Sequence, residues 1–169
     1  MDLNQIQKQL EEQLGGAVGP VEPGRLESWI EVDADKIDLA CEILRTAQGL
    51  RFDCLSNLTG VDYPDKGHVQ VVYNLMSYEL GHEVTLKVNA DRGAPKVNTC
   101  ENVWAAANWL EREAFDLLGV VFVGHSDLRR ILLPDDWVGF PLRKDYVEAP
   151  EYHGISTIRE SMLDIPGRS

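Results

Sequence analysis

The stretch "HVQVVYNLMSYELGHEVTLKVNA" (68–90) decides the fold class of this chain. Its second half alternates between apolar and polar side chains, in the order Val84, Thr85, Leu86, Lys87, Val88. A period of two residues is that of a β-strand with one buried face, and the intervening "ELGH" (79–82) supplies a turn. The stretch therefore predicts a β-hairpin that lays one apolar face against a core.

The segments on either side of the hairpin predict helices and further strands. A helical stripe of Leu3, Ile6, Leu10 and Leu14 is followed by a Gly/Pro loop at 15–24. We expect a strand followed by a helix in 27–50, with Asp33 or Asp35 as the helix cap. A strand and a turn-rich loop are expected in 52–67, and a polar connection in 91–100. The last elements are a helix over about 101–118 and a short strand from 120.

This order of elements favours an α/β (α+β) fold with two layers, in which a mixed β-sheet carries helices on one face. Helices and strands do not alternate strictly, so a doubly wound parallel sheet fits less well. Beyond Tyr146 apolar residues become sparse and the chain carries several Pro and Gly residues. We therefore expect a single domain over 1–146 and an extended C-terminal arm over 147–169, which docks on partner proteins.

The composition excludes several classes of partner and site. The 16 Lys and Arg residues face 28 Asp and Glu residues, giving a net charge of −12, whereas nucleic acid and anionic lipid require concentrated basic residues. No apolar run approaches the roughly 20 residues of a membrane span, and the acidic start does not resemble a signal peptide. Cys41, Cys54 and Cys100 are widely spaced, which favours reduced thiols over a metal or iron–sulfur site.

The helix over about 101–118 carries an acidic cluster whose members face different ways. Spacing residues by about 100° places Glu111 inside the apolar arc and Trp109 on the outer side. The same spacing points Arg112 and Asp116 away from the core and puts Glu113 at the edge of the polar side. An inward carboxylate needs a partner, and the candidates are Arg129, Arg130 and His125. We favour a structural ion pair over a general acid with a raised pKa.

The segment "GHSDLRRILLPDDWVGFPLRKDY" (124–146) contains residues that are typical of a binding surface rather than of a catalytic site. His125 and Asp127 lack a G-x-S-x-G nucleophile, and the four histidines are scattered, so we expect no catalytic and no metal-binding residue. Ser126 or Asp127 is expected to cap the turn that carries the two arginines. The partner-facing residues predicted from this segment are Trp137, Arg143, Lys144, Asp145 and Tyr146, with Trp109 beside them.

Residues 111–146, "EREAFDLLGVVFVGHSDLRRILLPDDWVGFPLRKDY", closely resemble the signature of the thirty-kilodalton subunit of the proton-pumping NADH:quinone oxidoreductase, respiratory complex I. This family is designated C in bacterial complexes and J in photosynthetic-type complexes. "LTGVDY" (58–63) and the hairpin resemble earlier parts of the family. One departure is Ser126, where the family usually has Pro.

The resemblance implies a non-catalytic subunit of the peripheral arm in a translocase that couples NADH oxidation to quinone reduction. It implies no cofactor bound by this chain, because the iron–sulfur clusters, flavin and quinone belong to partner subunits. The expected partners are the quinone-site subunit, designated D, and the neighbouring cluster-bearing subunits. The expected location is the cytoplasmic side of the inner (plasma) membrane, reached only through the complex. The residues expected to brace the helix–turn junction are Glu111, Arg112, Glu113, His125, Asp127, Arg129 and Arg130.

Two other interpretations stay open at this point. Membrane-bound hydrogenases, formate hydrogenlyase, cofactor F420-type dehydrogenases and the ferredoxin-dependent photosynthetic complex carry related subunits, and the electron donor cannot be read from this chain. A stand-alone enzyme that uses Glu111 or His125 is the third interpretation, and its purified chain would turn over a substrate.

Overall fold

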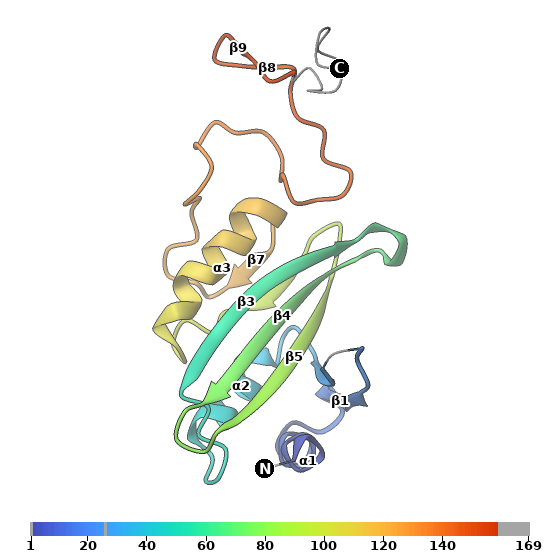
Figure 1. Cartoon of the computed structure of the whole chain (residues 1–169), viewed down its shortest axis with the longest axis vertical. Helices are drawn as coiled ribbons and strands as arrows, with labels where there is room; N and C mark the ends of the chain where they lie inside the picture. Colours follow the sequence, from blue (N-terminus) through green and yellow to red (C-terminus); the bar gives the residue numbers. More distant parts are fainter. Residues whose placement is uncertain (1, 26, 159–169) are drawn as a thin grey trace, which may run out of the picture.

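The computed structural model describes residues 2–25 and 27–158, and its centre is a five-stranded sheet (Figure 1). The strands are β1 (Val18–Glu22), β2 (Trp29–Val32), β3 (Cys54–Tyr63), β4 (His68–Ser77) and β5 (His82–Asp91). Their spatial order is β1-β2-β5-β4-β3, with β2 parallel to β5 and every other neighbour antiparallel. The predictions of a mixed sheet and of a β-hairpin at 68–90 are confirmed.

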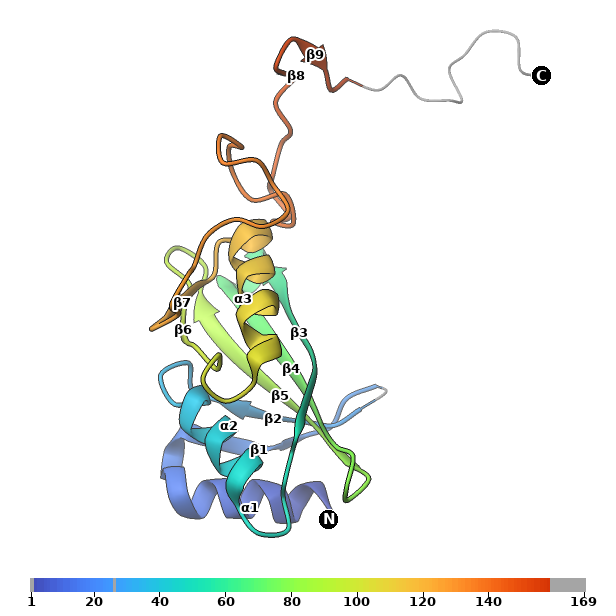
Figure 2. The ribbon, with the colours of Figure 1, turned by 90° about the vertical axis from the view of Figure 1, so that its left-hand side faces the viewer.

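Three helices supply the second layer: α1 (Leu3–Leu14), α2 (Ile37–Thr46) and α3 (Ala105–Leu118) (Figure 2). Along β4 and β5 the burial alternates, so that Val71 and its partner Val88 are fully buried while Val72 and its partner Lys87 are half-buried. The buried face of the sheet and the buried residues of all three helices form one hydrophobic core. The helices therefore share one face, and the opposite face of the sheet is half-exposed.

Helix α3 approaches the sheet closely at Gly60 of β3. A Cβ atom at Gly60 would lie 2.3 Å from Cδ1 of Leu118, which is itself 2 % exposed. The absence of a side chain at Gly60 lets the last turn of the helix lie directly on the strand. This contact fixes the C-terminal end of α3 to the sheet.

Several boundary predictions are wrong. Residues 15–24 contain β1 rather than only a loop, and "LTGVDY" is the second half of β3 rather than a turn-rich loop. The polar connection at 91–100 contains β6 (Lys96–Asn98), which pairs in parallel with β7 (Val121–Val123). Helix α2 begins after Lys36 without a side-chain cap from Asp33 or Asp35. Strand pairing over the whole length of β3 outweighs the turn preference of its Gly and Asp residues.

The chain after β7 leaves the sheet and helices at the end opposite to α1 (Figure 1). We call residues 124–146 the strap and residues 147–158 the arm. The arm contains a short hairpin of β8 (Glu151–Tyr152) and β9 (Ile155–Ser156). The rest of the predicted arm, 159–169, lies outside the described residues. Among the helices that the structure describes, none is long and apolar enough to cross a bilayer.

Candidate functional site

Glu111 lies on the core side of α3 and is fully buried, as its angular position predicts. Its partners are not the predicted Arg129, Arg130 or His125. The hydroxyl of Thr99 donates to one carboxylate oxygen, and the backbone N–H of Cys100 donates to the other at 2.7 Å. The donors come from the segment that precedes α3, because this segment folds back across the core side of the helix. Glu111 therefore ties the helix to its own entry segment.

Burial raises the pKa of Glu111 from its ordinary value of 4.5 to about 7. The hydrogen bonds from Thr99 and Cys100 oppose this rise, and the nearby charge of Glu101 adds to it. A carboxyl group with this pKa is neutral in acid and charged in mildly alkaline solution. Its titration therefore falls in the pH range where most proteins are handled.

Glu111→Gln is expected to remove a pH dependence of stability. Between pH 4.5 and 7 the unfolded chain releases the Glu111 proton while the folded chain keeps it, so the free energy of unfolding falls by about 2–3 kcal/mol as pH rises. Glutamine can accept from Cys100 but does not titrate. Urea unfolding of the full chain from pH 4 to 8 measures the slope, with the exposed Glu113→Gln as control. An unchanged slope in Glu111→Gln would show that another group causes it.

Arg112 and Asp116 point away from the core, as expected, but neither reaches solvent: Asp116 is fully buried and Arg112 is 6 % exposed. The strap covers the polar side of α3. One oxygen of Asp116 accepts from Nη1 of Arg130 at 2.8 Å, and the other accepts from three consecutive strap N–H groups, those of Ile131, Leu132 and Leu133, at 2.8–3.1 Å. Burial alone would raise the pKa of Asp116, but these four donors hold it below its ordinary value.

A second buried carboxylate, Asp62 at the end of β3, holds the last part of the strap. Arg92 forms a bidentate pair with Asp62 at 2.7 and 3.0 Å, and the backbone N–H of Lys144 donates to the same carboxylate at 2.9 Å. Arg92 also reaches Asp145 at 2.6 Å. The hydrogen bond from Arg92 lowers the pKa of Asp62 and outweighs the effect of burial. The sheet and the strap are thus joined by a charge-assisted network.

The guanidinium of Arg143 strengthens the same joint. Its Nε donates to the carbonyl of Leu118 at 2.8 Å, and one terminal nitrogen donates to the carbonyl of Arg92 at 3.3 Å. Of the predicted partner-facing residues, Arg143 and Asp145 therefore bond to other residues of this chain, although the side chain of Asp145 is 65 % exposed; Lys144 is exposed as well. Phe140 lies beneath this joint, with the guanidiniums of Arg143 and Arg130 at 5.1 and 5.8 Å from its ring centre.

The remaining junction residues are arranged around His125, whose side chain is fully buried. Its Nδ1 accepts from the N–H of Asp127 at 3.0 Å, and its Nε2 faces the carbonyl of Asn108 at 3.2 Å. This arrangement requires the proton on Nε2 and leaves neither nitrogen free as a base. Arg129 pairs with Asp127 at 3.0 Å. The side chain of Ser126 does not cap the turn and bonds to Glu101 instead.

Trp109 is 62 % exposed, and the guanidinium of Arg112 lies 5.1 Å from its ring centre. Nε of Arg112 donates to the carbonyl of Arg129, so Arg112 links α3 to the strap beside the tryptophan. The neighbouring Glu113 is exposed, whereas Trp137 and Tyr146 are half-buried within the strap. A large exposed aromatic side chain held by a fixed cation is typical of a protein-binding surface.

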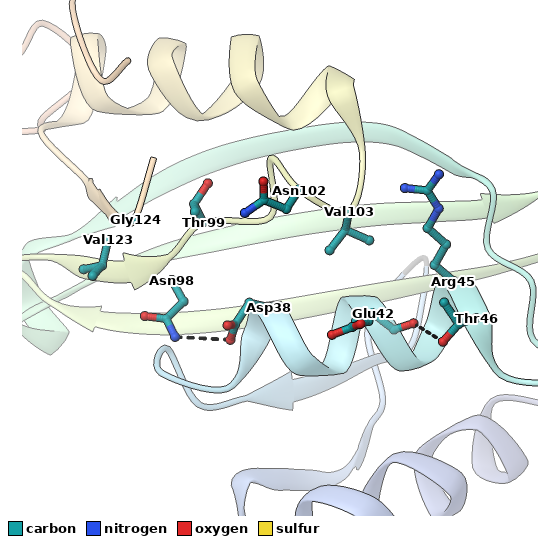
Figure 3. A pocket seen from close by; sticks show the side chains of 10 residues that line it. All are labelled: Asp38, Glu42, Arg45, Thr46, Asn98, Thr99, Asn102, Val103, Val123 and Gly124. Atoms are coloured by element: carbon teal, nitrogen blue, oxygen red, sulfur yellow. Dashed lines mark hydrogen bonds between the residues drawn. The ribbon is translucent and has the colours of Figure 1, made fainter. Parts of the chain in front are cut away.

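A surface groove lies elsewhere, between α2 and the segment that leads from β6 into α3 (Figure 3). Its volume is about 550 Å³, and its walls include Asp38, Glu42 and Arg45. Asn98 donates to Asp38, and Thr46 donates to the carbonyl of Glu42. The groove residues do not include Ser, Cys or His beside a base. Within the described ranges, no group of three or more potential metal ligands converges.

The residues that do most to hold the strap, Asp62, Arg92 and Asp116, are absent from the sequence-based predictions of site residues. Asp62 stands in the quoted "LTGVDY", and Asp116 in "EREAFDLLG". The sequence shows only one acidic residue near the end of a strand and one on a helix, each followed further along the chain by a run of basic residues. That signal does not reveal the main-chain N–H groups that complete both sites.

Comparisons with known proteins connect this geometry to a family. The family model described as "Respiratory-chain NADH dehydrogenase, 30 Kd subunit" matches residues 30–152. A protein of Chlorobium phaeobacteroides, named as the C subunit of NADH-quinone oxidoreductase, is 43% identical over 146 residues, covering 85% of this chain and 88% of its own length. A Moorella thermoacetica protein with the same name is 49% identical over 115 residues, covering 68% and 76%.

Two solved structures are similar as well. A chain of the membrane-bound sulfane sulfur reductase, an archaeal respiratory membrane complex, has a TM-score of 0.68 and 28% identity, covering 85% of this chain and 84% of that one. The trypsin-resistant fragment of Nqo5 has a TM-score of 0.58 and 26% identity, covering 76% of this chain and 100% of the fragment.

Proposed function

Because the chain belongs to the family of the 30 kDa subunit of respiratory-chain NADH dehydrogenase, we propose that it acts as a structural subunit of that complex. Its relatives are named as subunits of NADH-quinone oxidoreductase, an enzyme that couples NADH oxidation to quinone reduction. The chain contributes to this reaction as a subunit of the peripheral arm. The flavin, the iron–sulfur clusters and the quinone are bound by partner subunits.

One observation carries the proposal: the strap is fixed to the sheet and helices on its inner side, while several large apolar side chains of the strap and the arm stand exposed among charged ones. Buried carboxylates hold it at Asp62 and Asp116. Apolar side chains gathered at one end of a molecule mark an interaction surface, and the fixed backbone lowers the entropy cost of binding. The exposed apolar side chains of the strap and arm are Leu132, Val138, Leu142, Val147, Ile155 and Ile158.

We assign this surface to the quinone-site subunit and the cluster-bearing subunits beside it. The strap would keep these subunits in register, because electron transfer and quinone access depend on their relative positions. Trp109 and Lys144 would contact the same partners from the side of α3 and the end of the strap. The complex, and not this chain, would provide attachment to the cytoplasmic side of the membrane.

The experiment is purification of the native complex through an N-terminal tag on the full chain. Val138→Asp/Val147→Asp is expected to lower the recovered partner subunits at least tenfold, because each change buries a charge in an apolar interface. Tyr78→Asp/Leu80→Asp, at the far hairpin turn, is the matched control and should retain them. Equal recovery with both variants would contradict the assignment of the strap as the main interface.

A related complex is the second candidate, and the similarity to a chain of the sulfane sulfur reductase complex favours it. The identity of the co-purifying subunits separates the two. NADH-binding flavin subunits in the purified material would support the first candidate. A purified complex that lacks them and reduces a sulfur substrate or evolves hydrogen would support the second.

A further inference from the structure

We infer that the strap and arm together form a receptor for one arginine side chain of a partner protein. The receptor is a cavity of about 150 Å³ whose walls include Trp137, Tyr146 and Tyr152 and whose rim includes Glu148 and Glu151. The inference rests on the proposed function, because the arginine would belong to the neighbouring subunit that the strap meets.

The walls of the pocket are fixed by contacts between strap and arm. The carboxylate of Asp136 accepts from the hydroxyl of Tyr152 at 2.8 Å and lies 2.7 Å from Nε2 of His153. These bonds fold the β8–β9 hairpin onto the strap and bring Tyr152 to 5.1 Å from Trp137 between ring centres, at an interplanar angle of 51°. The ring of Tyr146 lies against Gly139, so close that a Cβ atom there would be 3.0 Å from the ring.

The chemistry of the pocket favours a cation. Aromatic faces carry partial negative charge and attract ammonium and guanidinium groups. Glu148 and Glu151 are exposed and, within the part of the chain that the structure describes, their carboxylates have no hydrogen-bond or salt-bridge partner. The charge of Asp136 is already shared by Tyr152 and His153, which leaves the two glutamates to meet the incoming cation.

A second feature favours a peptide over a free cation. Nε1 of Trp137 is buried and has no acceptor among the described residues. Trp137 lines the cavity. Buried indole N–H groups are normally bonded, so a small rotation of the ring toward an acceptor of the occupant would complete this site. A peptide offers a main-chain carbonyl next to its basic side chain, whereas a metal ion or an amine does not. A planar guanidinium also stacks on aromatic rings and pairs with carboxylates through two hydrogen bonds, which selects arginine over lysine.

The test is a titration of the ¹⁵N-labelled full chain with acetyl-Gly-Arg-Gly-amide, observed at the indole N–H of Trp137. The resonance is assigned with Trp137→Phe. We expect saturable binding, at least fivefold weaker binding of the citrulline peptide, and a three- to tenfold loss of affinity in Glu148→Gln/Glu151→Gln. Glu11→Gln/Glu12→Gln, on the exposed side of α1, removes the same charge elsewhere and should bind as the unchanged chain does.

Equal binding of the citrulline peptide, or unchanged binding in Glu148→Gln/Glu151→Gln, would overturn the inference. Binding that appears only in a chain ending at residue 158 would also overturn it, because residues 159–169 would then be the occupant. If the chain co-purifies with its complex but does not bind the peptide, only the arginine pocket is contradicted. If the chain binds the peptide but co-purifies with no other subunit, the proposed function is contradicted.

Discussion

Asp116→Ala is expected to lower the free energy of unfolding by about 3–5 kcal/mol, the range measured when one partner of a buried ion pair is removed. Two effects contribute. The guanidinium of Arg130, whose side chain is 18 % exposed, loses its carboxylate, and the N–H groups of Ile131, Leu132 and Leu133 lose their acceptor. A buried N–H left without an acceptor costs about 1–3 kcal/mol. Urea unfolding of the full chain at pH 7 measures the loss.

Asp127→Ala is the matched control. Asp127 is also an aspartate paired with a strap arginine, but its side chain is 50 % exposed and that of Arg129 is 72 % exposed. Exposed pairs of this kind contribute about 0–1 kcal/mol. Asp116→Asn should fall between the two, because its amide keeps one acceptor oxygen. If Asp116→Ala and Asp127→Ala cost the same, the strap is not held by the buried carboxylate.

The pH dependence of stability gives an independent check on Asp116. Its pKa in the folded chain lies below the ordinary value of 3.8, so the folded chain binds this proton less readily than the unfolded chain does. The stabilisation is therefore complete above the ordinary pKa and is lost as pH falls through the folded value. Glu111 behaves in the opposite way, because its pKa is raised and its stabilisation is lost as pH rises. Acid thus weakens the Asp116 site, whereas a rise in pH from 4.5 to about 7 weakens the Glu111 site.

The layers of the fold could be predicted from the sequence, because alternating burial is a local property. The order Val84, Thr85, Leu86 predicts a strand with one buried face, and β5 has that burial. Helical spacing likewise places Glu111 in the core and Trp109 outside. It does not predict the burial of Arg112 and Asp116, because a helical projection describes one helix and does not include the strap that later covers its polar side.

The partners of the buried carboxylates could not be predicted for a different reason. Glu111, Asp62 and Asp116 each accept from backbone N–H groups, and every non-proline residue carries one. Sequence reasoning looks for a charged side chain of opposite sign and so proposes Arg129, Arg130 or His125 for Glu111. The path of the main chain decides which N–H groups lie next to each carboxylate. That path depends on contacts between residues that are far apart in the sequence.

Gly119→Ala is expected to destabilise the chain by about 2–5 kcal/mol through two separable effects. Gly119 ends α3 in the left-handed conformation, with φ of 76°, where a Cβ atom costs about 1–2 kcal/mol. That Cβ would also lie 2.6 Å from the ring of Phe140, which adds about 1–3 kcal/mol of overpacking. Gly81→Ala is the control, because Gly81 has φ of 64° and nothing within 4 Å of its Cβ position.

The difference between the losses in free energy of unfolding of Gly119→Ala and Gly81→Ala measures the contact between the end of α3 and the strap. Adding Phe140→Ala to Gly119→Ala should recover the overpacking and leave the backbone strain. The recovered overpacking then appears as a coupling of about 1–3 kcal/mol in a double-mutant cycle. Equal losses at Gly119 and Gly81 would show that Phe140 does not rest on the end of α3. A displaced Phe140 also moves Arg130 and Arg143 at its two sides, so Gly119→Ala should reduce recovery of partner subunits more than Gly81→Ala does. Under the proposed function, one glycine would then connect the end of a core helix to the surface that holds the complex together.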